Sequence, residues 1–374
     1  MAIARIDQSI IGRWWWTVDR WTVVAIIILC GFGSIMIFAA SPAVATRIGA
    51  SSFYFVKHQL LLLPLTMLVI FGISLQSPRM VRRTAAITLL LSLVLLAATF
   101  VVGTEIKGAR RWVSLAGISI QPSEFVKPAF AVICAWLFAE QKNPNRRLPG
   151  NAIAIGLYLL IAAMLLKQPD LGQTVVISTI WFVEFFLAGL PIILVGLVMM
   201  AGAGGLVGAY FLFPHVHSRI DRFLNPQNGD SYQVTRSLEA FANGGLWGTG
   251  PGEGTVKNYL PDAHADFVFA VAGEEFGLVV CLAVVVVFAF VVLRGLSRLL
   301  SEQNLYVVLA GTGLLVQFGL QAVINMASTL HMIPTKGMTL PFLSYGGSSL
   351  LALGVGTGML LALTRKRYGA SEGL

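Results

Sequence analysis

The sequence predicts an all-α polytopic membrane protein of about ten transmembrane helices, with a long outer-face loop between spans seven and eight. Hydrophobic residues make up 56% of the 374 residues and charged residues only 11%, whereas an ordinary soluble domain is about a quarter charged. The mean hydropathy is +0.80. Ten apolar runs approach the roughly 20 residues that a spanning helix needs. They lie at 21–41, 58–76, 84–103, 123–140, 151–167, 172–189, 191–213, 266–293, 304–327 and 346–363.

The first run is expected to be a retained helix and not a cleaved signal peptide. It is longer than the roughly 7–15 apolar residues of a signal peptide, and Trp14–Trp16 with Trp21 resemble the aromatic belt at a membrane interface. Ten spans place both termini on one side, and the short loops of that side carry more Lys and Arg than the opposite loops. We therefore expect one transmembrane domain, 1–374, with a cytoplasmic N-terminal segment (1–20) and a cytoplasmic tail (364–374).

The formal net charge of +9 comes from Lys and Arg in short clusters between apolar blocks. Such clusters favour anionic lipid as a partner over nucleic acid, which a continuous basic stripe or arm would bind. The three cysteines, Cys30, Cys134 and Cys281, lie inside apolar runs without CxxC or histidine spacing. This pattern argues against a disulfide framework and against a zinc site.

The connection at 214–265 is much longer than the others, and long loops in compact proteins often carry function. It contains an amphipathic stretch, Tyr232–Ala242, and a glycine-rich turn, Gly244–Gly250. We expect short surface helices that fold over the membrane as a large periplasmic loop.

Charged residues near the spans are candidates for function, because an ionised side chain at mid-bilayer costs about 2.5–3.5 kcal/mol. Glu124 and Lys127 are three residues apart, so they can pair on one helical face, either to stabilise the helix or as part of a site. Pro169–Gly172 predicts a broken helix beside a polar cavity. Asp170 is there either a helix cap or a ligand for a sugar or cation. For Glu184, deeper in the next span, we expect a packing role.

The segment Leu260–Ala270 leads from the long loop into span eight and puts Asp266 at the membrane boundary. Asp266 is either a helix cap or a functional carboxylate. Glu274 and Glu275 lie about 80° and about 180° around the helix from it, so the three carboxylates cannot face one cavity. Small and polar residues recur in Ser344–Ser349, as tight helix packing or as a cavity wall.

Several motifs together carry a resemblance over nearly the whole chain. They are Gly108–Trp112, Gln121–Lys127, Pro169–Gly172, Leu260–Ala270 with Gly273–Gly277, and Ser344–Ser349. In this order they resemble the SEDS proteins (shape, elongation, division and sporulation). The stretch Ile333–Phe342 is similar to the division branch of that family, whereas the elongation branch usually lacks its Thr-Lys-Gly. Ala265 departs from the family pattern, which commonly has Thr there, so the hydrogen bonding of Asp266 is open to change.

The resemblance implies a peptidoglycan glycosyltransferase that polymerises lipid II on the outer face of the inner membrane at the division septum. Its implied partners are a class B penicillin-binding protein and other divisome membrane proteins. Joining a sugar hydroxyl to an anomeric carbon with inversion needs a base. Asp266 is our candidate because we expect it at the boundary between the inner membrane and its outer face. The leaving undecaprenyl pyrophosphate is a stable anion, so cations can replace the acid that a glycosidase needs.

The expected substrate-binding residues are the charged and polar groups of the same motifs. They are Arg110, Arg111, Trp112, Glu124, Lys127, Asp170, Gln173, His264, Lys336 and Ser344. The cations among them would hold the pyrophosphate or offset its charge. A divalent cation, Mg or Mn, could share this task with Asp170 or Glu124 as ligands, but no spacing requires a cofactor.

A lipid II flippase is the main alternative, because intramembrane ion pairs, a broken helix and a polar cavity are also transporter features. A flippase needs charged groups along the full membrane depth, whereas these charges cluster at the outer end. The elongation homologue with the same chemistry is a further alternative. A non-catalytic division scaffold would leave Asp266 and the Arg110–Arg111 pair without a role.

Overall fold

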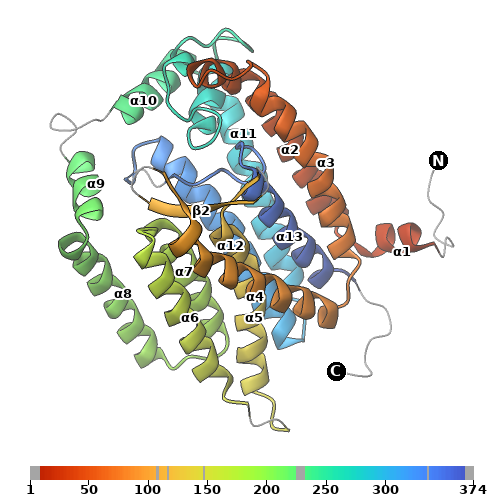
Figure 1. Cartoon of the computed structure of the whole chain (residues 1–374). Helices are drawn as coiled ribbons and strands as arrows, with labels where there is room; N and C mark the ends of the chain where they lie inside the picture. Colours follow the sequence, from red (N-terminus) through yellow and green to blue (C-terminus); the bar gives the residue numbers. More distant parts are fainter. Residues whose placement is uncertain are drawn as a thin grey trace.

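The computed structural model describes residues 9–106, 109–115, 118–145, 148–224, 232–334 and 337–366. Within them, eight helices are long and apolar enough to cross a membrane, and two shorter apolar helices join them in a tilted bundle (Figure 1). The ten are α2 (Arg20–Arg47), α3 (Tyr54–Ser74), α4 (Pro78–Val102), α5 (Pro122–Gln141), α6 (Gly150–Lys167), α7 (Leu171–Leu187), α8 (Ile192–Leu212), α11 (Val268–Leu299), α12 (Leu305–Thr329) and α13 (Gly347–Leu363). Each coincides with a predicted span, so the ten-helix prediction is confirmed.

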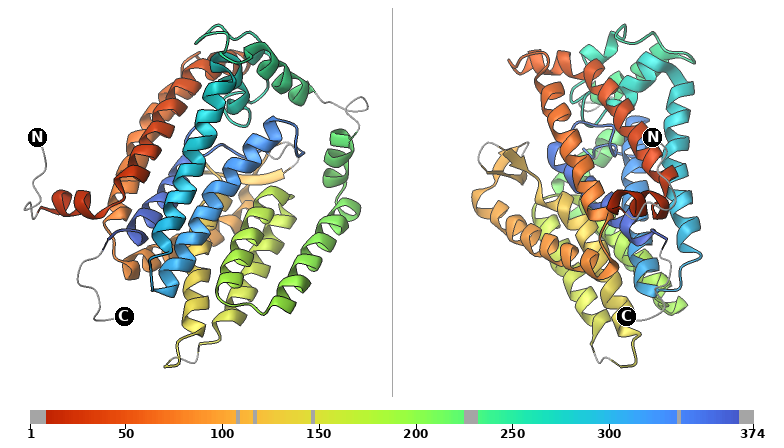
Figure 2. Two further views of the ribbon diagram at one scale, coloured as in Figure 1. Left: turned by 180° about the vertical axis from the view of Figure 1, so that it is seen from behind. Right: turned by 90° about the vertical axis from the view of Figure 1, so that its right-hand side faces the viewer.

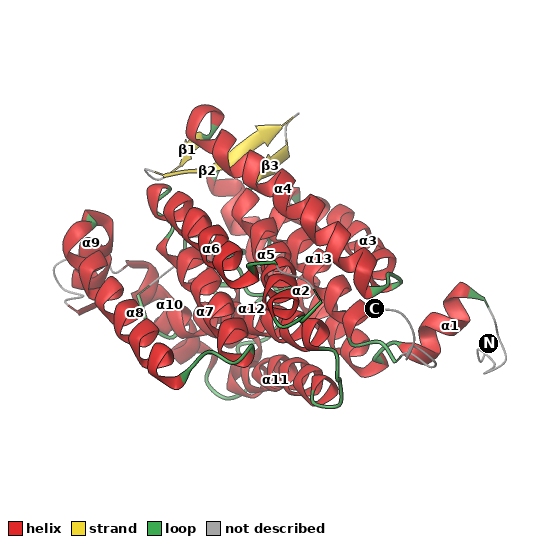
Figure 3. Ribbon diagram, turned by 90° about the horizontal axis from the view of Figure 1, so that it is seen from below, coloured by secondary structure: helices red, strands yellow, loops and turns green. Residues whose placement is uncertain are grey.

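Helices α5 and α12 form the centre of the bundle. In their most apolar windows 83% and 72% of the residues are buried, against 6% in α8 at the rim. Figure 3 shows α5 and α12 enclosed by other helices and α8 at the edge. Small buried residues such as Ala131 and Ala135 let neighbouring backbones approach α5 closely. Large side chains such as Phe130 and Phe138 fill the rest of this core and are fully buried.

One end of the bundle, called here the terminus end, carries the first and last described segments, where the Lys366 N–H donates to the Thr17 carbonyl at 3.0 Å. Helix α1 (Ile10–Thr17) projects sideways there (Figure 1). Asp19, which precedes α2, is 2% exposed and pairs with Arg294 at 3.1 Å and with Arg298 at 3.0 Å, near the end of α11. A buried carboxylate needs such partners, and these ion pairs attach the first span to the eighth.

The opposite end, called here the loop end, carries three short strands that the all-α prediction did not include. They are β1 (Thr104–Ile106), β2 (Ala109–Leu115) and β3 (Ile118–Ile120), in an antiparallel sheet of order β1-β2-β3. Val113 lies opposite Ile120 in this sheet. Figure 2 shows the sheet standing off one side of the bundle. Strands of three residues are too short for a sequence pattern and depend on their paired neighbours.

The long connection contains short helices, as the sequence predicts. They are α9 (Pro214–Leu224), α10 (Tyr232–Gly244) and a 3₁₀ turn, η2 (Val256–Asn258). Helix α10 packs across the start of α11, and Ser237 on it donates to the Thr329 carbonyl at the end of α12, at 2.7 Å. The loop is therefore fastened to the two helices that flank the Asp266 segment.

Helix α11 is interrupted at Gly277, whose φ is +76°. The glycine-rich turn at 244–250 supplies the backbone hydrogen bonds that the break removes. The N–H groups of Thr249 and Gly250 donate to the carbonyls of Glu274 (2.9 Å) and Glu275 (3.0 Å), and the N–H groups of Leu278 and Val279 donate to the carbonyls of Gly245 (3.0 Å) and Leu246 (3.3 Å). Glycine is needed at 277 because a Cβ there would overlap the backbone of this turn.

Candidate active site

Asp266 lies in a tight turn just before α11. The N–H of Asp266 donates to the Asp262 carbonyl at 3.1 Å. Helix α11 is capped by Phe267 without a side-chain hydrogen bond, so Asp266 does not cap it. The Asp266 side chain is half-buried, and one carboxylate oxygen lies 3.4 Å from where a Cβ on Gly337 would stand. The carboxylate therefore faces the backbone turn that follows Lys336.

The main chain beside Asp266 is fixed by hydrogen bonds on three successive carbonyls. Those of His264, Ala265 and Asp266 accept from the Tyr345 N–H (2.8 Å), the Ser344 hydroxyl (2.5 Å) and the Asn325 amide Nδ2 (2.9 Å), respectively. Ala265 is thus held through its backbone carbonyl. The donors come from α12 and from the segment before α13, which presets the position of Asp266.

His264, predicted to bind substrate, lies in an aromatic cluster. Its ring centroid is 4.2 Å from that of Phe55 and 5.4 Å from that of Tyr345. Burial lowers the pKa of His264 from 6.5 to about 4, so the imidazole is neutral at pH 7. Ser344, predicted as a substrate ligand, also accepts from the Leu340 N–H at 2.8 Å. Both residues therefore lie within the packing and hydrogen bonds that hold the Asp266 segment.

A chain of buried polar side chains connects α7 with the segment before α13. Lys127 pairs with Glu124 at 2.9 Å, which confirms the predicted ion pair. The chain continues through Gln173 on Glu124 (2.5 Å), Gln321 on Lys127 (2.8 Å) and Thr339, whose carbonyl accepts from Gln321 at 3.1 Å. Lys127 is 0% exposed. In this conformation Lys127 therefore pairs with Glu124 within α5, links α5 to α12 through Gln321 and does not reach a substrate.

Arg111 and Asp170 hold the break between α6 and α7. The Arg111 guanidinium donates to the carbonyls of Gln168 (3.3 Å) and Pro169, and its Nε lies 3.6 Å from Asp170 Oδ2. Asp170 accepts from the Gln173 N–H at 3.4 Å, so the helix-cap interpretation of Asp170 is confirmed. The predicted broken helix is present, with an arginine filling the polar gap.

The remaining predicted site residues lie around the sheet and near Asp266. Arg110 is half-exposed and pairs with Glu105 at 3.4 Å. Trp112 is partly buried on β2, and its carbonyl accepts a 3.5 Å hydrogen bond from the Thr104 hydroxyl. Lys336 lies outside the described residues, although a Cβ added to Gly337 beside it would stand 3.4 Å from the Asp266 carboxylate.

A family model described as cell cycle protein, covering FtsW, RodA and SpoVE, matches residues 20–369. This chain belongs to that family. It is 46% identical over 373 residues to the probable peptidoglycan glycosyltransferase FtsW of Caulobacter vibrioides, covering 99% of this chain and 95% of that one. It is 36% identical to the corresponding Escherichia coli protein, covering 90% and 83%. The resemblance to the division branch is thereby confirmed.

Two solved structures share the fold of this family member. A chain from a peptidoglycan synthase complex, described for the coordination of polymerization and crosslinking, superimposes with a TM-score of 0.77 at 28% identity and covers 93% of this chain and 97% of its own. The RodA rod shape determining protein of Thermus thermophilus superimposes with a TM-score of 0.66 at 27% identity and covers 94% and 97%. The polytopic architecture is therefore that of the FtsW and RodA proteins.

Sequence reasoning missed the polar residues of α12 that organise this family member's site. Asn325 donates to the Asp266 and Met338 carbonyls at 2.9 and 2.6 Å, and Gln321, one turn earlier, bonds to Lys127. Their spacing of four residues puts both on one helical face. The available signal was their polarity within an otherwise apolar span, which marks a functional face.

The roles of Glu274 and Glu275 were also left open by the sequence. The Glu274 carboxylate accepts from Asn243 and from three successive backbone N–H groups at 255–257, at 2.7–2.9 Å. Glu275 pairs with Lys257. Both carboxylates therefore fasten the long loop to α11.

Asp170 and Glu124 do not fit the divalent-cation site that the sequence left open. Asp170 is paired with Arg111, and Glu124 is paired with Lys127 and bonded to Gln173. Mg²⁺ and Mn²⁺ favour sites with carboxylate charge and open oxygen ligands, and here both carboxylates already neutralise cations. Across the described ranges, no group of three or more His, Cys, Asp or Glu side chains could hold a metal.

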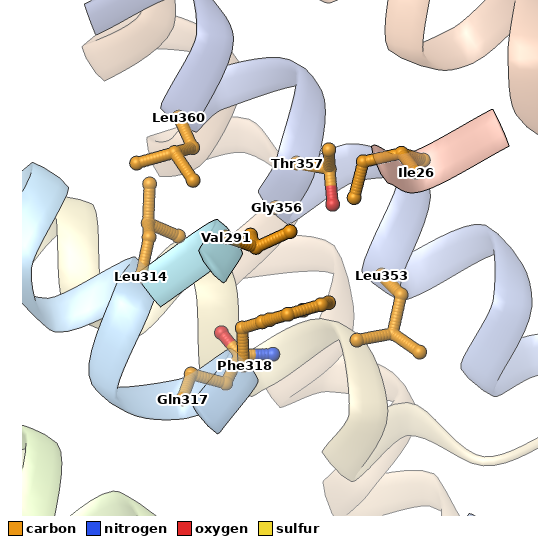
Figure 4. A pocket seen from close by; sticks show the side chains of 9 residues that line it. All are labelled: Ile26, Val291, Leu314, Gln317, Phe318, Leu353, Gly356, Thr357 and Leu360. Carbon is orange, nitrogen blue, oxygen red and sulfur yellow. The ribbon is translucent and has the colours of Figure 1, made fainter. Parts of the chain in front are cut away.

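A small cavity of about 10 Å³ lies deep in the bundle between α2, α11, α12 and α13 (Figure 4). Its lining is mostly apolar, with Gln317 and Thr357 as polar members. This volume suffices for about one water molecule. The cavity is therefore too small to be a substrate site, and the candidate active site remains the Asp266 turn.

Proposed function

We propose that this chain is a peptidoglycan glycosyltransferase of the FtsW type, which polymerises lipid II with Asp266 as general base. The observation that carries the proposal is the fixed main chain of residues 264–266, which presents a half-buried carboxylate at the loop end. Asp266 is not used as a helix cap. The names of the FtsW relatives support the same reaction class.

In the proposed reaction, a sugar hydroxyl of one lipid-linked substrate attacks the anomeric carbon of the other. Asp266 takes the hydroxyl proton as the new C–O bond forms and the bond to the pyrophosphate oxygen breaks, with inversion. The undecaprenyl pyrophosphate leaves as an anion and needs no protonated acid. Lys336 is the predicted cation best suited to meet it, because Arg111 and Lys127 are engaged within the protein and Arg110 pairs with Glu105 beside the sheet.

The polar chain from Asp170 to Thr339 supports this reaction by fixing the backbone that faces Asp266. Met338 and Thr339 follow Gly337, and both accept hydrogen bonds from α12 through their carbonyls. A preset backbone keeps the base and the cations in register, so that binding energy is not spent on ordering them. Glu124, Lys127 and Gln173 are positioning residues in this scheme.

We place the reaction on the outer face of the inner membrane, at the division septum. The proposed topology has the 1–20 segment and the 364–374 tail in the cytoplasm, the 214–265 loop in the periplasm and 1–374 as one domain. The first and last described segments meet at the terminus end, where the Lys366 N–H donates to the Thr17 carbonyl at 3.0 Å. A class B penicillin-binding protein is the proposed partner, since a similar chain belongs to a peptidoglycan synthase complex.

Strand synthesis from fluorescent lipid II tests the proposal. The purified chain is combined with its partner, inactivated only at the transpeptidase site, and compared with Asp266→Asn and Asp262→Asn. Asp262 has a φ of +53°, which asparagine tolerates, so its variant is a matched control in the same turn. We expect strands with the wild type and Asp262→Asn and none with Asp266→Asn, while lipid II binding persists in all three.

Other outcomes separate the alternatives. Strand synthesis by Asp266→Asn at the wild-type rate would place the base elsewhere. If no variant makes strands but wild-type vesicles move lipid II across the bilayer, the chain is a flippase. A scaffold would do neither.

A further inference from the structure

A second polar site lies at the loop end beside the sheet, and none of its lining residues belongs to the Asp266 turn. It is a cavity of about 190 Å³ between the end of α4, the β1–β2 hairpin and the end of α6. For comparison, an engineered cavity of about 150 Å³ binds benzene, so this one admits a group of phosphate size. Its lining includes Arg110, Lys167, Glu105 and Phe100.

The charged groups of this cavity leave it with a positive excess. Arg110 meets Glu105 at 3.4 Å, with both side chains more than half exposed, and an exposed pair of this kind contributes little. Lys167 has no ion pair within the described parts of the chain, and its ammonium lies 5.2 Å from the centroid of the Phe100 ring. Two cations and one carboxylate therefore face the cavity, which suits an anion.

Strand β2 gives its two arginines different tasks. Successive side chains of a strand point to opposite faces, and Arg111 is turned inward, where it bonds to the Gln168 and Pro169 carbonyls. Gln168 and Pro169 also line the cavity, so Arg111 fixes the cavity wall from inside. Arg110 is turned outward and remains available to a ligand.

The surroundings of the cavity indicate a ligand with an apolar tail. Val101 and Val102, next to Phe100 at the end of α4, are 82% and 62% exposed. In a membrane protein, apolar side chains with this exposure face lipid. A molecule with its charged head in the cavity can lay its tail along this end of α4.

We propose that this cavity binds the phosphate or diphosphate head group of a membrane lipid, with Arg110 and Lys167 as its ligands. Both side chains carry donors suited to phosphate oxygens. A polyprenyl diphosphate and an anionic phospholipid share this chemistry. The polyprenyl case rests on the proposed function, whereas the phospholipid case is independent of it.

Photo-crosslinking provides a local test in the full-length protein. A photoreactive benzoylphenylalanine replaces Val102, and the purified chain is exposed to undecaprenyl pyrophosphate, to phosphatidylglycerol or to undecaprenol, which has the polyprenyl tail without the diphosphate. The double variant Arg110→Gln, Lys167→Gln is compared with Lys142→Gln. Lys142 is an exposed cation that follows the last residue of α5.

We expect the phosphate-bearing lipids to be captured in preference to undecaprenol, and the double variant to lower their capture about tenfold. Lys142→Gln should have no effect. Loss confined to undecaprenyl pyrophosphate identifies a substrate-type head group, and loss of both lipids identifies a general lipid phosphate site. Equal capture of undecaprenol, or unchanged capture by a folded double variant, would overturn the proposal.

Failure of this proposal is distinguishable from failure of the proposed function. Capture requires no turnover, so Asp266→Asn should retain it while strand synthesis is lost. A chain that makes strands but shows no head-group preference at 102 refutes only the cavity proposal. A chain that shows the preference but makes no strands refutes only the glycosyltransferase proposal.

Discussion

Replacing Asn325 by leucine removes the two hydrogen-bond donors that hold the backbone on both sides of the candidate base. Nδ2 of Asn325 donates to the carbonyls of Asp266 and Met338 at 2.9 and 2.6 Å. Leucine has a similar volume and no donor, so it isolates the hydrogen bonds from the packing. Both carbonyls would then lie beside an apolar side chain.

Two magnitudes decide what this change should do. Hydrogen bonds between membrane helices contribute about 0.6 kcal/mol on average and about 1.7 at most, so losing both costs roughly 1–3 kcal/mol. A fold stabilised by about 5–15 kcal/mol survives this loss. A displacement of about 1 Å at a catalytic group, by contrast, can cost about 10²-fold in rate. We therefore expect strand synthesis to fall about 100-fold while the protein remains folded.

The assay measures the initial rate of strand synthesis together with the thermal unfolding midpoint. Gln317→Leu is the matched control, because Gln317 lies two turns earlier on α12, is 3% exposed and has a side-chain oxygen without a hydrogen-bond partner. It should keep the wild-type rate. A folded Asn325→Leu variant within about threefold of the wild-type rate would refute the reasoning, as would an equal loss in Gln317→Leu.

Three further predictions concern the frame of the site. Lys127→Met leaves Glu124 buried without its cation and should cost about 3–5 kcal/mol; denaturation midpoints should recover in part when Glu124→Gln is added, and a single-variant cost below about 1 kcal/mol would contradict the pairing. Gly277→Ala should lower the unfolding midpoint by several degrees, because Gly277 has a φ of +76° and a Cβ would stand 2.6 Å from the Leu246 carbonyl carbon; Gly72→Ala, with no atom within 4 Å of its added Cβ, should not. Burial lowers the pKa of His264 from 6.5 to about 4. Between these pH values His264 binds fewer protons in the folded protein than in the unfolded protein, so its contribution to stability falls as the pH drops from about 6.5 to about 4. His264→Phe should remove up to about 1.4 kcal/mol per pH unit from that slope in unfolding titrations, and an unchanged slope would mean that another group titrates.

The spans were predictable because the bilayer imposes a length of about 20 apolar residues on each of them. The Glu124–Lys127 pair and the Asp170 cap were predictable for a related reason, since both are contacts within three residues. Lys127 and Gln321, by contrast, are 194 residues apart in the chain, and no local pattern joins them.

The roles of the two arginines were not separable from sequence, because the strand that turns them to opposite faces is set by pairing with its neighbours. Lys167 ends the apolar run at 151–167, but its place in the same cavity lining as Arg110 depends on how the hairpin folds onto α6. Side-chain direction within short strands is thus a property of the tertiary structure.

The turn at 244–250 completes α11 across its break, and this has a consequence for how the chain can vary. A membrane helix ordinarily satisfies its own backbone, so the connections outside it can change length freely. Here, the second half of the helix begins with N–H groups that donate to Gly245 and Leu246. An insertion or deletion between this turn and Gly277 would leave polar backbone groups unpaired at the membrane surface. The turn and α11 must therefore be kept together in any chimera or engineered variant.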